Sequence, residues 1–157
     1  MAKLVDLNGD WSTAIGRAFV AFGGIEHVTV VCLRQLPRDK LQKSTRAFRL
    51  GQRIALLLEI LEAYPTPAYQ QLASHLERAK ALAETRNLIA HNPLVLDIYE
   101  RPDGTLFHQQ VIAAMHKDRK VTLEELRAFA DESEELASAL YGASLEVIRL
   151  HGSRAGT

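Results

Sequence analysis

Cysteine is nearly absent from this chain of 157 residues, since Cys32 is the only one. A single cysteine excludes an internal disulfide framework and a cluster of thiolate metal ligands. Net charge is also absent, because 19 Lys and Arg residues balance 19 Asp and Glu residues. This balance argues against a protein whose whole surface binds a polyanion, although it allows a local basic patch.

The sequence also lacks the short motifs of several common enzyme classes. It has no P-loop, no Gly-rich dinucleotide-binding loop and no Ser or Cys nucleophile motif. Five histidines lie without the paired spacing that metal ligands need: His27, His75, His108, His116 and His151. We therefore expect neither a metal site nor a cofactor.

Long apolar segments are missing as well. The N-terminal segment contains no apolar core of a signal peptide, and no run of the chain reaches the length of a membrane span. We therefore expect a cytoplasmic protein without a membrane partner. Apolar residues make up 47% and charged residues 24%, which is typical of a globular domain. We expect a single helical domain over residues 1–152 and a frayed tail over 153–157.

The first predicted helix has two non-polar faces. Asn8 or Asp10 can cap its start, and one apolar stripe follows at helical spacing: Trp11, Ile15, Ala18, Phe22 and Ile25. The second face carries Gly16, Val20 and Gly23. Such a helix is central in its bundle or half-buried in a dimer interface. The β-branched run 28–33 is compatible with a strand, but the periodicity around it favours a helix.

A second helix is predicted over residues 39–63, and its first half is basic. Arg46, Arg49 and Arg53 share one face of this helix because they are three and four residues apart. This face is either a solvated surface or a partner for the acidic last helix. The other interpretation is a patch that binds phosphates.

A third helix is predicted to run to about His91. Thr66 suits the N-cap position of that helix, and Pro67 suits its first turn. Two β-rich runs follow within residues 94–112, and the Pro-Asp-Gly sequence between them has strong turn chemistry. This segment therefore predicts a short β-hairpin.

The last helix is predicted to start after Thr122. Thr122 and Glu125, three residues later, form a capping box. Gly152 is expected to cap its C-terminal end. The predicted fold is thus mainly α. It is a four-to-five-helix up-down bundle with a small β-hairpin insertion between the last two long helices.

Polar residues interrupt the apolar stripe at the end of the third helix. That stripe follows positions 72, 76, 79 and 83, so Arg86 and Asn87 occupy the next inward positions. A charge on a buried seam is unfavourable unless it is paired or partly hydrated. His91 lies four residues after Asn87, in the last turn, where the helix dipole favours an imidazolium.

These residue types suit phosphoryl chemistry without a metal. A histidine that exchanges its proton near neutral pH serves in acid–base catalysis. A guanidinium beside it binds a phosphate and stabilises the charge that builds on it. A purely structural interpretation is also open. In that case His91 caps the helix, and Arg86 pairs with a buried acid such as Glu26 or Glu84.

At these residues the chain resembles the HEPN superfamily of small helical proteins. The segment Arg-Asn-Leu-Ile-Ala-His-Asn, residues 86–92, matches the family pattern of an arginine, a polar residue and a histidine near a helix end. The resemblance covers the helical core and does not require the hairpin. It implies a helical bundle that dimerises with its motif helices facing each other. It also implies a metal-independent endoribonuclease of toxin or defence type.

The resemblance further implies a role for each residue of the motif. His91 would transfer a proton at the 2′-hydroxyl or the leaving oxygen, Arg86 would stabilise the phosphorane, and Asn87 would orient the phosphate or the histidine. Cleavage would leave a 2′,3′-cyclic phosphate. Glu26 is expected to support Arg86, and four further residues are expected to contact the substrate: Arg46, Arg49, Arg53 and Asn92. The expected partners are RNA, a second copy of the chain, and an antitoxin or other protein.

Two other functions fit the same residues. One is a non-catalytic interaction module, in which the Arg86, Asn87 and His91 side chains form a structural polar network. The other is a nucleotide-binding helical protein that uses the basic face near Arg49.

Overall fold

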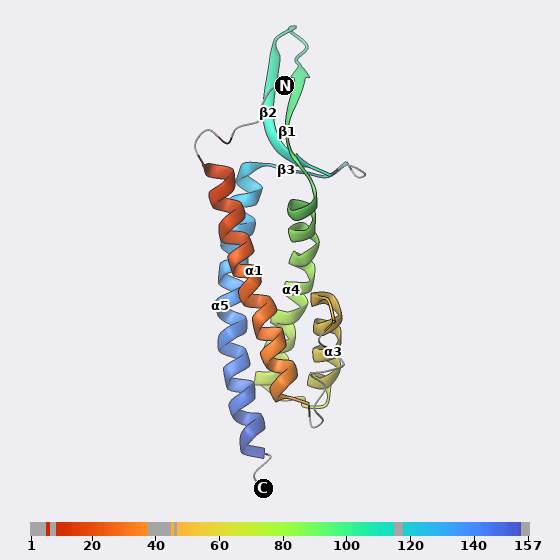
Figure 1. Ribbon diagram of the computed structural model, residues 1–157, viewed down its shortest axis with the longest axis vertical. Helices are drawn as coiled ribbons and strands as arrows, with labels where there is room; N and C mark the ends of the chain where they lie inside the picture. Colours follow the sequence, from red (N-terminus) through yellow and green to blue (C-terminus); the bar gives the residue numbers. More distant parts are fainter. Residues whose placement is uncertain (1–5, 7–8, 38–44, 46, 115–117, 155–157) are drawn as a thin grey trace.

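The protein is a helical bundle with a small sheet at one end, shown as a computed structural model in Figure 1. The structure describes residues 6, 9–37, 45, 47–114 and 118–154. Its helices are α1 (Asp10–Gln35), α3 (Leu50–Glu62), α4 (Pro67–His91) and α5 (Leu123–Arg154). Its strands are β1 (Leu94–Glu100), β2 (Leu106–Ala113) and β3 (Lys120–Val121). The predicted fold class is confirmed.

Helices α1 and α5 form the main helix pair of the bundle. They run in the same direction in Figure 1, and α4 runs the opposite way. The Phe22 and Phe129 rings stack between α1 and α5 with their centroids 5.8 Å apart. Burial of such apolar faces is the main favourable term in folding. The run 28–33 is helical, as expected, and Cys32 is fully buried.

The β-hairpin continues the chain directly from the C-terminal end of α4 and extends beyond the bundle in Figure 1. β1 and β2 are antiparallel, with Leu94 opposite Ile112 and Glu100 opposite Leu106. Gly104 closes the turn with a positive φ of 81°, which a residue without a Cβ adopts readily. The two-residue strand β3 was not predicted and pairs with the end of β2.

Helix α3 is shorter than predicted. It begins at Leu50 rather than at residue 39, because the backbone of Arg49 is extended and residues 47–49 are not helical. The Arg49 N–H donates to the Gln52 side chain at 2.9 Å, which stabilises this start. Residues 38–44 and Arg46 lie outside the described residues.

Helix α5 is longer than predicted, because it continues through Gly152 to Arg154. The expected Gly152 cap is therefore wrong, because the helix continues past this residue. Of the expected frayed tail, residues 155–157 lie outside the described part of the chain.

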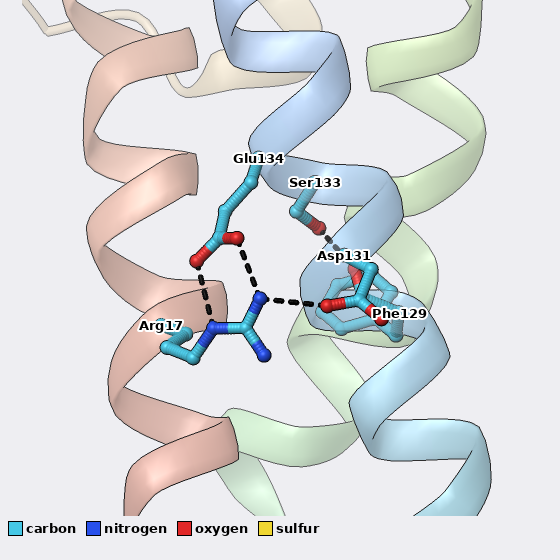
Figure 2. A network of polar contacts seen from close by, with 5 residues as sticks. All are labelled: Arg17, Phe129, Asp131, Ser133 and Glu134. Carbon is cyan, nitrogen blue, oxygen red and sulfur yellow. Dashed lines mark hydrogen bonds and ion pairs between the residues drawn. The ribbon is translucent and has the colours of Figure 1, made fainter.

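The acidic helix α5 is paired with arginines of α1 and α4. Figure 2 shows Arg17 of α1 donating to Glu134 through Nε at 2.9 Å and to Asp131 through Nη2 at 2.6 Å. This hydrogen bonding holds the pKa of Glu134 below its ordinary value. Arg78 of α4 pairs with Glu132 at 3.3 Å. Among the described residues, Arg17 and Arg78 therefore pair with the acidic helix, which was one of the roles considered for the basic face of the second helix.

Helix α1 has the length and apolar composition that a membrane span needs. The expectation that no run reaches that length is wrong by this measure. In the structure one face of α1 lies in the core of the bundle, where Ala18 and Ile25 are fully buried.

Candidate functional site

Three helices meet around one groove with a volume of about 830 Å³. We call it the arginine groove. Its lining comes from the middle of α1, the N-terminal turn of α3 and the C-terminal turns of α4. The lining residues are Glu26, Arg49, Leu50, Gly51, Gln52, Arg53, Ala83, Glu84, Arg86, Asn87 and His91.

Arg86 is held by three different side chains. Its guanidinium lies over the Phe19 ring, 5.4 Å from the centroid. Nη1 donates to Asn87 Oδ1 at 3.2 Å, and Nη2 donates to Glu26 Oε1 at 3.4 Å. The remaining donor, Nε, is buried and has no hydrogen-bond partner among the described residues. Leaving a buried donor unpaired is costly, so the described contacts do not satisfy Arg86 fully.

Arg53 approaches the same carboxylate from α3. Its Nη2 lies 3.7 Å from Glu26 Oε2, and its side chain is only 16% exposed. The Nε atom of Arg53 is also buried and lacks a hydrogen-bond partner within the described residues. Glu26 therefore bridges two arginines, one with each carboxylate oxygen. Of the two acids considered as partners of Arg86, the structure places Glu26 in contact with it, but Glu26 is partly exposed and not buried.

The first turn of α3 adds positive potential to the arginine groove. Arg49 is exposed in the N-cap position, and Leu50 and Gly51 follow it along the groove. The first N–H groups of a helix have no partner within the helix, and the helix dipole is positive at this end. The groove therefore combines three arginines and a helix N-terminus with two carboxylates, Glu26 and Glu84, and its electrostatics favour an anion.

His91 and Asn87 lie on the exposed side of the last turns of α4. Both line the arginine groove, so the structure brings the three motif residues Arg86, Asn87 and His91 together. The imidazole of His91 is solvent-exposed, so a ligand in the groove can contact it.

Asn87 does not occupy a buried position, contrary to the prediction, and Arg86 is only partly buried, with 30% of its side chain exposed. Arg86 and Asn87 do continue the face of α4 that carries residues 72, 76, 79 and 83, but at this end of the helix that face borders the groove. Leu88 and Ile89 are the buried residues of this turn. The expected burial fails because the start of α3, which borders this face, leaves a groove there instead of a packed core.

Asn92 is not part of the arginine groove. Its Nδ2 donates to the Leu88 carbonyl at 2.8 Å and closes the C-terminal end of α4. Its extended backbone then leads the chain into β1. Asn92 thus has a capping role in the structure, and its predicted substrate contact stays a prediction. The predicted contact of Arg46 concerns a residue outside the described part of the chain.

Sequence reasoning missed two parts of the site. The helix start at Leu50 carries no Ser, Thr, Asp or Asn at the N-cap, so the sequence gives no capping signal there. Phe19 lies seven residues before Glu26, which places both on one face of α1. That spacing is the one signal that could have linked Phe19 to Arg86.

Across residues 6, 9–37, 45, 47–114 and 118–154, no three His, Cys, Asp or Glu side chains gather as metal ligands. Comparison with models of protein families, with curated proteins and with solved structures finds no match.

Proposed function

We propose that the chain is a HEPN-like, metal-independent endoribonuclease that cleaves RNA in the arginine groove. The observation that carries this proposal is the convergence of Arg86, Asn87 and His91 with Arg49 and Arg53 on one groove. The motif residues alone could serve a helix end. Their position opposite two further arginines fits a site for a negatively charged strand.

Each motif residue has a distinct role in the proposed reaction. Arg86 binds the scissile phosphate and stabilises the extra charge of the phosphorane. The 2′-oxygen attacks phosphorus while the bond to the 5′-oxygen breaks, which leaves a 2′,3′-cyclic phosphate. His91 takes the proton from the 2′-hydroxyl or gives one to the leaving 5′-oxygen, and a water molecule makes the other proton transfer. Asn87, through its amide, orients the phosphate or the imidazole.

The proposal includes a homodimer, and α1 provides a surface for it. Val20 is 79% exposed, and its exposed neighbours on this face are Gly16 and Gly23. Small residues allow a second helix to approach closely, and a two-fold dimer uses the same surface on both copies. In a toxin or defence role, an antitoxin or other protein is the further partner proposed.

A non-catalytic interaction module is the second candidate. The observation in its favour is that Arg86 already contacts Glu26, Asn87 and Phe19. In this case the contacts of Arg86 stabilise the fold, and the groove holds no substrate. Arg86→Ala would then lower the melting temperature strongly, while the wild-type protein would neither bind nor cut RNA.

Cleavage of single-stranded RNA in the presence of EDTA tests the first proposal. We expect wild-type protein to produce 2′,3′-cyclic phosphate ends and to leave an all-deoxy strand intact. His91→Ala should reduce the rate about 10²-fold or more, the usual scale of acid–base catalysis. His108→Ala is the matched control because His108 is an exposed histidine of the hairpin, outside the groove. Wild-type protein that cuts no RNA, or a His91→Ala variant with full activity, would refute the proposal.

A further inference from the structure

The Glu26 carboxylate lies between two guanidinium groups in a way that differs from a tight ion pair. Each oxygen faces one arginine, Oε1 at 3.4 Å from Arg86 and Oε2 at 3.7 Å from Arg53. Strong charge-assisted hydrogen bonds between these groups are shorter, about 2.7–2.9 Å. The carboxylate therefore lies at the centre of a positive site without filling it.

Both arginines are held in place by contacts other than Glu26. Arg86 is fixed by the Phe19 ring and by Asn87 Oδ1, and the Arg53 side chain is largely buried. Glu26 itself is more exposed, with 36% of its side chain accessible. The carboxylate can therefore swing into solvent while the two guanidinium groups keep their positions.

The two arginines still have donors to offer when Glu26 is in place. Nε of Arg53 and Nε of Arg86 are both buried and have no partner among the described residues. A carboxylate presents two acceptor oxygens, whereas a phosphate presents more, and arginine binds both in the same forked geometry. A phosphate between the two guanidinium groups can therefore accept hydrogen bonds from both arginines at the position that Glu26 occupies.

We propose that the Glu26 carboxylate stands where a phosphate group binds, between Arg53 and Arg86. Binding of the phosphate displaces Glu26, so this residue competes with the ligand. The identification of that phosphate as part of an RNA strand rests on the proposed function. The site itself does not, because any phosphate oxyanion has the chemistry that the two arginines recognise.

The affinity of Glu26→Gln for phosphate ligands tests this assignment. The probes are inorganic pyrophosphate and a single-stranded DNA oligonucleotide, both in EDTA at fixed ionic strength and measured by isothermal titration calorimetry. We expect E26Q to bind pyrophosphate about tenfold more tightly than wild type, the scale of one charge-assisted contact. A parallel gain for the oligonucleotide indicates that the ligand is a strand, and a gain for pyrophosphate alone indicates a free phosphate compound.

Glu84→Gln is the matched control, because Glu84 lines the same groove but forms no ion pair within the described residues. It removes the same charge without opening the space between the arginines, so its gain should stay within about twofold. The double variant E26Q/R53Q should lose the gain of E26Q. Circular dichroism checks folding, and Glu26→Ser replaces E26Q if that variant unfolds.

The opposite result overturns the assignment. If E26Q binds pyrophosphate no more tightly than wild type, or if E84Q gains as much, Glu26 does not occupy a phosphate position. This outcome is separate from the test of the proposed function, since neither probe is cleaved. Wild-type protein that cuts no RNA, together with a tenfold gain in E26Q, would reject the nuclease and retain the phosphate site.

Discussion

The contacts of Arg86 bear on whether this residue binds a ligand or only stabilises the fold. A guanidinium that only stabilises a fold gains most when its donors are paired, because a buried unpaired donor is costly. Arg86 instead has one long contact to Glu26, one amide contact and one aromatic ring, and its Nε is buried without a partner among the described residues. Arg53 likewise has one long contact to Glu26, at 3.7 Å, and a buried Nε without a partner among the described residues. Two such arginines on one groove support the proposal that the groove binds an anion.

Arg17 presents the contrasting case of a paired surface arginine. Its hydrogen bonds to Glu134 lower the pKa of that carboxyl from 4.5. We expect Arg17→Gln to raise the pKa of Glu134 back toward 4.5. A lowered pKa in the folded state contributes stability above the ordinary pKa, and this contribution is lost as the pH falls through the folded value. R17Q should therefore be less stable than wild type near neutral pH, with the difference vanishing in acid.

An NMR pH titration measures the pKa of the Glu134 carboxyl in both proteins. Urea unfolding at neutral pH and at acidic pH measures the difference in stability between R17Q and wild type. Arg149→Gln is the control, because Arg149 lowers the pKa of Glu146 on the same helix. It should leave the titration of Glu134 unchanged. An unaltered Glu134 titration in R17Q would contradict the contact drawn in Figure 2.

At the scale of single elements, sequence periodicity predicted the long helices and the hairpin well. The stripe from Trp11 to Ile25 and the Pro-Asp-Gly turn each carry a local signal, and each element is present. The start of α3 at Leu50 has no such signal. Arg49, a poor capping residue, holds the N-cap position with an extended backbone. The two-residue strand β3 could not be predicted from local sequence either, because it is defined by its pairing with β2.

The two predicted threonine caps behave differently. At Thr122 the hydroxyl accepts the Glu125 N–H at 3.2 Å, and the Glu125 carboxylate accepts the Thr122 N–H at 2.8 Å. At Thr66 the backbone is extended and Pro67 follows, but the hydroxyl is buried and has no partner among the described residues. The capping signal located both helix starts, yet only one threonine makes the bond that the signal implies.

Replacement of Thr122 tests the working cap. We expect Thr122→Ala to lower the free energy of unfolding by about 0.5–2 kcal/mol, because the Glu125 N–H loses its acceptor. Thr122→Ser keeps the hydroxyl and should lie close to wild type. Urea unfolding followed by circular dichroism compares the three proteins. Equal stability of T122A and wild type would mean that solvent replaces the cap without cost.

At the scale of the whole molecule, the site depends on the meeting of three helices. The sequence pointed to Arg86, Asn87 and His91 because they are neighbours on one helix. It placed Glu26, Arg49 and Arg53 as candidates from charge and spacing alone. It could not show that these residues line one groove, because that depends on where α3 begins relative to α1 and α4. The inward position expected for Asn87 failed for the same reason.

The proposed dimer is also a property of the whole molecule. We expect wild-type protein to sediment as a dimer and Val20→Arg to sediment as a monomer, because two charges would face each other across the two-fold axis. Ile98→Arg is the control, since Ile98 is 62% exposed on the hairpin, away from this face. It should remain dimeric. The dimer surface on α1 is wrong if wild type is a monomer or if V20R still dimerises with unchanged helix content.

Trp11 connects the helical bundle to the sheet, and its fluorescence can report on this contact. It is the only tryptophan of the chain, it is buried in α1, and its indole Nε1 donates to Gln110 of β2 at 3.1 Å. Indole emission therefore reports on the seating of the sheet against the bundle, whereas the far-ultraviolet signal reports on the helices. Local release of the sheet, which lies next to His91, would change the fluorescence before the helices unfold.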